Sequence, residues 1–293
     1  MDNRPIGIFD SGVGGLTVVK ELKKLLPEED IIYFGDTGRT PYGTRSKDTI
    51  LRYVQQDIAF LLQEDVKMVV AACGTASAVL TDTVVKRLDV PYTGVILHAV
   101  QKACAMSSQG IIGVIGTTAA VRSGAYGKAI RSVRPDARVI GRDCPLFVPL
   151  VENGFIERDN QVTRLVAQQY LEFFRGEDID TLILGCTHYP ILYDTIYDVI
   201  SEIAERPVTL IDPGQETAIY VKNHLTQEGL LHAPREDAQK AKGEKGNEKP
   251  IGYSRYYVSD TTDRFIEVAD RFLGAAVEGT VEQVDIDSFP LLL

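Results

Sequence analysis

The sequence is poor in cysteine and contains no tryptophan and no long apolar run. Its 293 residues include 4 cysteines, Cys73, Cys104, Cys144 and Cys186, too few and too scattered for a disulfide framework. No apolar run approaches the roughly 18 residues that a membrane span requires. The N-terminus leads directly into a strand-like segment and leaves no room for a signal peptide. These absences predict a cytoplasmic protein with reduced thiols and no membrane partner.

Positive charge is also scarce. Lys and Arg number 31 against 41 Asp and Glu, giving a net charge of −10, which argues against nucleic acid or an anionic membrane as the main partner. The length corresponds to about two domains. The hydrophobic fraction of 44% is ordinary for a globular chain, so disorder is excluded for most of it.

Short apolar runs alternate with amphipathic stretches along most of the chain. Because the runs are apolar throughout, they predict parallel strands covered on both faces, and hence an α/β fold. Ligands in such folds usually bind at the carboxyl ends of the strands. The predicted strands span residues 6–9, 31–34, 68–71, 111–115 and 182–184, and the predicted helices span 16–26, 48–63, 160–174 and 189–204.

The C-terminal region departs from this rhythm. Residues 233–250 are polar and charged, which predicts a solvated loop or a disordered insert. Structure is expected to resume with a strand at 256–258. Thr261 or Thr262 then caps a helix, whose predicted apolar face consists of Phe265, Val268, Ala269 and Phe272.

The two halves of the chain repeat each other weakly. Residues 6–11 resemble residues 112–117, and residues 69–75 resemble residues 182–187. In each half one strand ends near a small hydroxyl residue and another is followed by a cysteine and then a threonine. If two such halves face each other, Cys73 and Cys186 approach one cleft from opposite sides.

Both of these cysteines precede a predicted helix, over residues 75–86 and 189–204. A helix N-terminus lowers the pKa of a thiol, so we expect both thiols to be activated. A buried cysteine taken alone more often fills core space, and that interpretation is kept for Cys104 and Cys144. The sequence offers no C-x2-C pair, so no metal site is predicted beside Cys186 and His188.

A glycine-rich loop at residues 10–15 follows a predicted strand and opens a helix, as anion-binding loops do. It lacks the spacing of a dinucleotide or phosphate loop, and a small carboxylate suits it as well. Two thiols on opposite sides of a substrate suit removal of a proton from one face and delivery to the other. Asp10 and His188 are expected to tune the two thiols, although Asp10 could instead cap the following helix.

Four motifs together resemble the bacterial glutamate racemase family. They are Asp-Ser-Gly-Val-Gly-Gly-Leu-Thr at 10–17, Pro-Tyr-Gly at 41–43, Ala-Cys-Gly-Thr-Ala at 72–76 and Leu-Gly-Cys-Thr-His-Tyr-Pro at 184–190. The resemblance extends from about residue 6 to about residue 274. It implies interconversion of L- and D-glutamate without a cofactor, with Cys73 acting on the D-enantiomer and Cys186 on the L-enantiomer. Segment 144–152 also matches, which implies that Glu152 is an auxiliary acid near His188. The implied substrate contacts are Asp10, Ser11, Tyr42, Gly43, Thr75, Thr117, Thr187 and His188.

The resemblance also implies two pseudo-symmetric α/β domains with mostly parallel sheets, the active site between them, and a homodimer. Residues 1–97 plus 208–293 would form the first domain, and residues 98–207 the second. Two departures stand out: Gly74 replaces a family Asn whose side chain contacts the substrate, and residues 238–250 form an insert. The implied role is supply of D-glutamate for peptidoglycan. The alternative is a weakly active racemase-like protein that binds and inhibits DNA gyrase.

Overall fold

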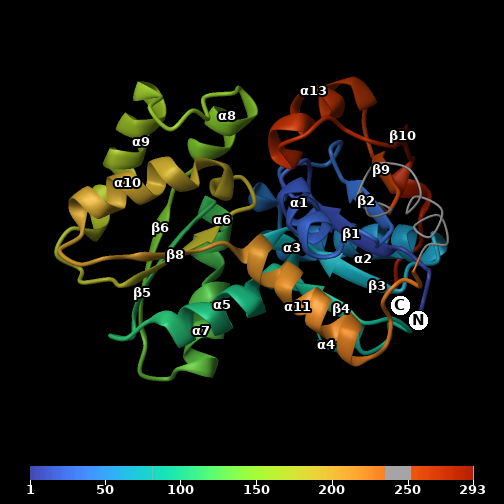
Figure 1. The fold of residues 1–293 in the computed structure, drawn as a ribbon, viewed down its shortest axis with the longest axis horizontal. Coiled ribbons are helices and arrows are strands. Elements are labelled where there is room, and N and C mark those ends of the chain that lie inside the picture. Colours follow the sequence, from blue (N-terminus) through green and yellow to red (C-terminus); the bar gives the residue numbers. More distant parts are fainter. Residues whose placement is uncertain (81, 235–251, 293) are drawn as a thin grey trace, which may run out of the picture.

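The computed structural model describes residues 1–80, 82–234 and 252–292. Two parallel sheets lie side by side, with helices covering their faces (Figure 1). The larger sheet has the order β10-β9-β2-β1-β3-β4 and the smaller has the order β6-β5-β7-β8. Their strands are β1 (Ile6–Asp10), β2 (Ile31–Gly35), β3 (Met68–Ala71), β4 (Tyr92–Gly94), β5 (Ile111–Gly116), β6 (Arg138–Asp143), β7 (Thr181–Gly185), β8 (Thr209–Ile211), β9 (Ser254–Val258) and β10 (Thr280–Gln283).

Helices connect successive strands, as parallel pairing requires. The α-helices are α1 (Leu16–Leu25), α2 (Lys47–Gln63), α3 (Gly74–Val79), α4 (Asp82–Val85), α5 (Val95–Met106), α6 (Thr118–Ser123), α7 (Ala125–Val133), α8 (Phe147–Glu152), α9 (Gln161–Leu171), α10 (Tyr193–Ile203), α11 (Pro213–Gln227) and α13 (Thr262–Leu273). The 3-10 turns are η1 (Tyr42–Thr44), η2 (Glu172–Phe174), η3 (Tyr189–Leu192) and η5 (Ile286–Ser288).

The internal repeat predicted from the sequence is present in the topology. The order β2-β1-β3-β4 in the larger sheet matches the order β6-β5-β7-β8 in the smaller one. All the pairings are parallel. The two half-chains therefore place equivalent strand ends at equivalent positions. The predicted α/β class with two parallel sheets is confirmed.

Local sequence explains several helix starts. Ser46 caps α2 by accepting from the Thr49 backbone N–H at 3.2 Å, and Asn160 caps α9 through the Thr163 N–H at 3.1 Å. Thr261 is the N-cap position of α13, and Phe265 on that helix is buried, as the sequence predicts. The whole of the predicted insert at 238–250 lies outside the described residues, within the undescribed range 235–251.

The helix predictions over residues 189–204 and 75–86 are wrong in part. Residues 189–192 form the 3-10 turn η3, and α10 begins only at Tyr193. The chain does not form a single helix over residues 75–86, because α3 ends at Val79 and Leu80 is extended. The Ser77 hydroxyl lies 2.9 Å from the Cys73 carbonyl oxygen and accepts from the Val95 N–H at 3.2 Å. Packing against the start of α5 thus holds α3 to a short turn of helix, which local helix propensity alone does not reveal.

The apolar core continues from one sheet to the other. A single buried cluster includes Ile8 of β1 and Leu184 of β7, and α11 contacts both α1 and α5 at the junction of the halves (Figure 1). β8 pairs with β7, so the smaller sheet reaches beyond residue 207, the predicted limit of the second domain. The division into two domains itself stays a prediction.

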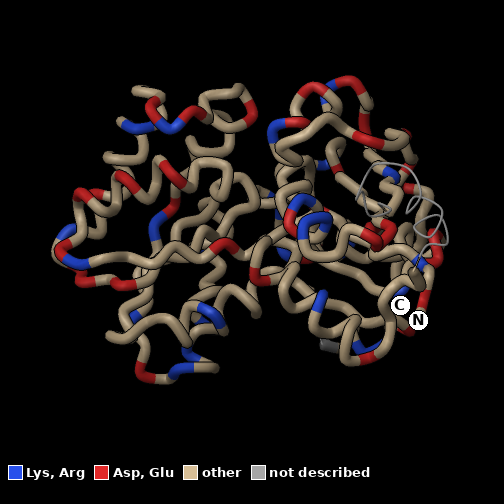
Figure 2. The backbone as a smooth tube through the Cα atoms, viewed as in Figure 1, with Lys and Arg blue, Asp and Glu red and all other residues tan. Residues whose placement is uncertain are grey.

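Acidic and basic residues are interspersed along both halves in the view of Figure 2. Within the described ranges, no helix has the length and apolar character needed to cross a membrane.

Candidate active site

The two halves meet where the carboxyl ends of their central strands face each other. A small cavity of about 10 Å³ is lined by Gly74 from the first half and by Gly185 and Cys186 from the second. A Cβ added at Gly74 would lie 3.5 Å from the Gly185 carbonyl oxygen. Thr17 Oγ1 lies 3.2 Å from the Thr187 carbonyl oxygen, which bridges the halves beside this cavity. The residues on either side of Cys73 therefore meet Cys186 at this cavity, while the approach of both thiols to one cleft stays a prediction.

Cys73 lies in a buried and acidic environment. It is 6% exposed, occupies the N-cap position of α3, and its thiol donates to Ser11 Oγ at 3.4 Å. Burial and the adjacent Asp10 carboxylate raise the pKa of Cys73 to about 12. The expectation that a helix start lowers this pKa is wrong, because burial and a neighbouring anion outweigh the N–H groups of so short a helix.

Asp10 ends β1 with its carboxylate buried. Oδ2 accepts from the Gly12 N–H at 3.0 Å, while the N-cap position of α1 is Gly15. Asp10 therefore belongs to the turn of the glycine loop, and the alternative that it caps the helix is wrong. Burial raises the pKa of Asp10, and the charge of His188 opposes that rise.

Cys186 has the opposite kind of neighbour. His188 Nδ1 lies 3.9 Å from Cys186 Sγ, and His188 Nε2 lies 3.2 Å from Glu152 Oε1. Burial lowers the pKa of His188, but the hydrogen bonds to Cys186 and Glu152 outweigh burial and raise that pKa to about 10. The hydrogen bond from His188 lowers the pKa of Glu152. At neutral pH an imidazolium–carboxylate pair therefore places positive charge beside the Cys186 sulfur.

Position 14 of the glycine loop has no room for a side chain, because the loop passes close to Thr187 and His188 there. A Cβ at Gly14 would lie 2.1 Å from Thr187 Oγ1 and 2.7 Å from His188 Nδ1. No side chain fits at such distances, so Gly14 lets a loop of the first half touch the cysteine segment of the second half. The sequence predicts an anion-binding loop, whereas the structure explains Gly14 by its close contact with the Cys186 segment.

The remaining predicted contact residues converge on the same junction from η1, α3 and α6. A Cβ at Gly43 would lie 3.9 Å from Thr117 Oγ1, and Thr117 caps α6 by accepting from the Ala120 N–H at 3.2 Å. Thr75 lines a second cavity of about 360 Å³ between these elements. That cavity is also lined by Arg45, Lys47 and Lys128, and its lining within the described part of the chain includes no acidic residue.

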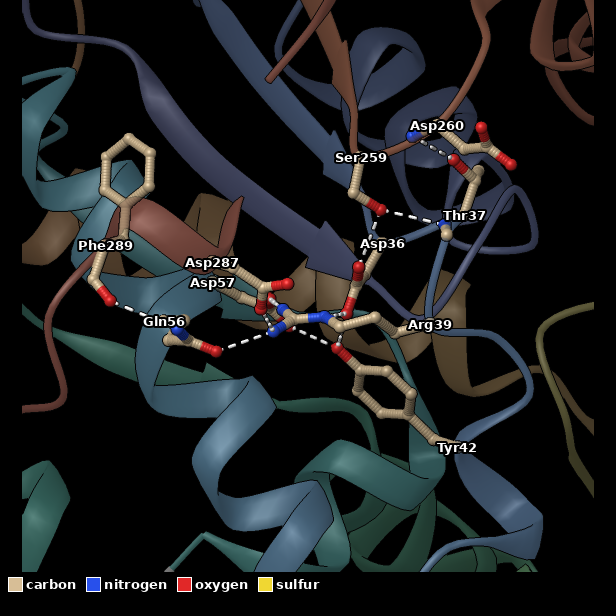
Figure 3. A network of polar contacts seen from close by, with 11 residues as sticks. Asp36, Thr37, Arg39, Tyr42, Gln56, Asp57, Ser259, Asp260, Asp287 and Phe289 are labelled. Carbon is tan, nitrogen blue, oxygen red and sulfur yellow. Dashed lines mark hydrogen bonds and ion pairs between the residues drawn. The ribbon is translucent and has the colours of Figure 1, made fainter. Parts of the chain in front are cut away.

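The Tyr42 side chain is directed into a network of buried carboxyl groups. It is buried, and its hydroxyl lies 2.5 Å from Asp36 Oδ2 and 2.7 Å from Asp57 Oδ2 (Figure 3). Burial, together with the Asp36 charge, raises the pKa of Asp57 well above its ordinary value, and the Tyr42 hydroxyl bridges the two carboxyl groups. Arg39 pairs with both carboxyl groups, at 2.7 and 3.0 Å. The Tyr42 hydroxyl is therefore already occupied by two carboxyl groups.

Two residues at the junction are absent from the sequence prediction. Asp212 follows β8 and caps α11 through the Gly214 N–H at 2.7 Å, and burial raises its pKa to about 6. Tyr126 of α7 is 4% exposed, and both residues line the small cavity. The Asp-Pro-Gly sequence after a strand could have signalled the cap. Nothing in the sequence around Tyr126 predicts a role at the site, because a single tyrosine on the apolar face of a helix is typical of a core residue.

Among the described residues, no three His, Cys, Asp or Glu side chains gather as ligands of a metal ion would. The predicted independence from metals and cofactors stays a prediction.

Curated relatives match nearly the whole chain. A glutamate racemase of Geobacter metallireducens is 45% identical over 285 residues, covering 97% of this chain and 98% of that protein. A glutamate racemase of Chlorobaculum tepidum is 42% identical over 271 residues, covering 92% of each chain.

Solved structures agree. Glutamate racemase from Francisella tularensis in complex with D-glutamate superposes with a TM-score of 0.84 at 37% identity, covering 99% of this chain and 100% of that chain. Glutamate racemase from Thermus thermophilus in complex with β-chloro-D-alanine gives a TM-score of 0.81 at 39% identity, covering 98% and 99%. The sequence profile described as Asp/Glu/Hydantoin racemase matches residues 15–220. With these likenesses the family predicted from the motifs is confirmed, and the chain belongs to the Asp/Glu/Hydantoin racemase family.

Proposed function

We propose that this protein is a glutamate racemase that moves a proton between the two faces of the substrate α-carbon. The observation that carries the proposal is the meeting of the Cys73 and Cys186 segments, one from each half, at one small cavity. The resemblance to glutamate racemases along nearly the whole chain supports glutamate as the substrate.

The chemistry balances without a further reactant. With L-glutamate, the Cys186 thiolate takes the α-proton and the bonding pair stays on carbon, after which the Cys73 thiol donates its proton to the opposite face. Cys186 then carries the proton and Cys73 the charge, so the reverse reaction begins from Cys73 with D-glutamate. Positioned acid–base groups of this kind each contribute about 10²–10⁴ in rate.

The neighbours of each thiol support this division. His188, held by Glu152, supplies positive charge to the side that starts with L-glutamate. Asp10 lies beside Cys73, and its buried carboxylate accepts hydrogen bonds from backbone N–H groups of the glycine loop. We propose that this carboxylate also pairs with the ammonium group of the substrate. For the substrate carboxylates we propose contacts with Ser11, Thr75, Thr117, Thr187 and the backbone at Tyr42 and Gly43.

The biological role that follows is supply of D-glutamate for peptidoglycan. We propose a cytoplasmic homodimer that needs no cofactor. The alternative of a gyrase-binding protein finds no support, since the named relatives are glutamate racemases.

Circular dichroism tests the proposal. Purified protein, dialysed against a chelator and given L-glutamate alone, should bring the optical signal of the amino acid to zero as the enantiomers equalise. Cys104→Ser, a thiol on α5, is the matched control and should leave the rate unchanged. A signal that stays constant with fresh protein, or that decays only when a metal or pyridoxal phosphate is added, refutes the proposal.

A further inference from the structure

Tyr126 contributes a buried hydroxyl that has no hydrogen-bond partner among the described residues. The side chain is 4% exposed and belongs to α7 of the second half. Nearly all buried polar groups in proteins have a partner, and leaving one without a partner destabilises the fold. The hydroxyl lines the same cavity as Cys186, and a cavity of about 10 Å³ has room for a single oxygen atom beside it, such as one oxygen of a ligand carboxylate.

The hydroxyl also lies beside the position where this chain departs from the family pattern. A Cβ added at Gly74 would lie 3.9 Å from Tyr126 Oη. An asparagine amide built on that Cβ would reach the same space. Glycine leaves this space open between Tyr126, Cys186 and Thr187, which all line the cavity.

The ring of Tyr126 is fixed in place. A Cβ at Gly185 would lie 3.0 Å from Tyr126 Cε2, so the ring packs directly on the glycine before Cys186. Burial, with the nearby cysteines, raises the pKa of Tyr126, and the phenol therefore stays a neutral donor throughout the physiological range. A rigid neutral donor suits a carboxylate oxygen.

We propose that the Tyr126 hydroxyl donates the substrate hydrogen bond that the family asparagine provides at position 74. The donor has moved from α3 of the first half to α7 of the second. This inference rests on the proposed function, because it places one carboxylate oxygen of glutamate in the cavity. Tyr126 is then a substrate-binding residue that neither donates nor accepts the α-proton.

The competing interpretation is that Tyr126 once paired with an asparagine and is now only a remnant. The two interpretations predict opposite results for Tyr126→Phe, which removes one oxygen and keeps the ring. If the hydroxyl binds glutamate, its loss weakens binding about 10-fold or more, as expected for a hydrogen bond to a charged group. If it is a remnant, its loss leaves binding unchanged and raises Tm.

Calorimetric titration with D-glutamate is the decisive measurement, because it needs no turnover. We expect Kd to rise about 10-fold in Tyr126→Phe, and KM to rise with little change in kcat, since the carboxylate is charged throughout the reaction. Tyr92→Phe is the matched control: Tyr92 on β4 also carries a buried hydroxyl without a partner in the described ranges but does not line the cavity. Its Kd should equal that of the parent.

A double-mutant cycle completes the test. In a Gly74→Asn background, where the amide can serve the substrate, Tyr126→Phe should cost clearly less than in the parent. Equal Kd values for parent and Tyr126→Phe overturn the inference, as does an undiminished cost in the Gly74→Asn background. A parent that binds D-glutamate tightly but does not racemise it refutes the proposed function and leaves the Kd comparison to decide on Tyr126.

Discussion

The two halves of the molecule share a strand order but surround their cysteines with opposite charge. Cys73 is buried and faces Ser11 and Asp10. Cys186 is half-buried and faces the cation of a His188–Glu152 pair. The repeated β-α topology thus places the two thiols equivalently, while the loops after the strands differentiate them. The scaffold is therefore pseudo-symmetric, but the surroundings of the two thiols are not. The site can in this way treat the two enantiomers of one substrate differently.

The largest expected difference between the halves is in thiol reactivity. A pKa of about 12 for Cys73, against 9.0 for an ordinary thiol, reduces its thiolate fraction about 1000-fold at neutral pH. In the ligand-free protein, iodoacetamide should therefore modify Cys73 about 10³-fold more slowly than free cysteine, and well after Cys186. Mass spectrometry of each cysteine-containing peptide over time measures both rates. Equal rates of modification at Cys73 and Cys186 would contradict the proposed difference in electrostatic environment between the two thiols.

The contact between Gly14 of the first half and Thr187 of the second can be disrupted by adding a single methyl group. Gly14→Ala puts a methyl group 2.1 Å from Thr187 Oγ1, so the loop or the cysteine segment must move, at a cost of about 1–3 kcal/mol. Both Tm and racemisation should fall. Gly12→Ala in the same loop is the control, because its methyl group meets only Thr40 Oγ1 at 3.7 Å. If Gly14→Ala behaves like Gly12→Ala, the loop does not depend on this contact.

The smallest expected effect concerns the ion pair of the second half and its pH dependence. The raised pKa of His188 stabilises the fold fully below pH 6.5, and this stabilisation is lost as pH rises through about 10. The lowered pKa of Glu152 stabilises it fully above pH 4.5, and this is lost as pH falls further. Glu152→Gln should therefore lower Tm most between about pH 4.5 and 6.5, by roughly 2–4 °C.

Thermal unfolding of parent and variant across pH 4 to 10 checks this prediction. The exposed Glu157→Gln is the control, and its Tm should follow the parent at every pH. A Tm difference for Glu152→Gln that grows toward pH 10 contradicts the assigned charge states.

The sequence predicts the central strands well, since runs such as residues 111–115 and 182–184 are apolar for their whole length. The strands it does not reveal are polar or short, such as the largely exposed β10 and the mixed β6 (Arg138–Asp143). These edge strands are defined by pairing with a neighbour, and local composition carries little of that information.

The candidate site divides in the same way. Cys73, Cys186, Asp10 and His188 could be predicted because each lies at or just after the end of a strand, in a motif that the sequence shows. The buried environment of Cys73 is not readable, because it depends on how the two halves pack, and Tyr126 reaches the site from a helix with no motif. Sequence thus predicts which groups meet, while their proton affinities require the three-dimensional packing.

The central claim, one thiol for each enantiomer, is tested most directly by loss of the substrate α-proton in D₂O during a single pass. We predict that Cys73→Ser mainly abolishes proton loss from D-glutamate, that Cys186→Ser mainly abolishes it from L-glutamate, and that neither variant racemises at an appreciable rate. Cys104→Ser should match the parent with both enantiomers. Racemisation at near the parental rate in either Cys73→Ser or Cys186→Ser would contradict the two-thiol account.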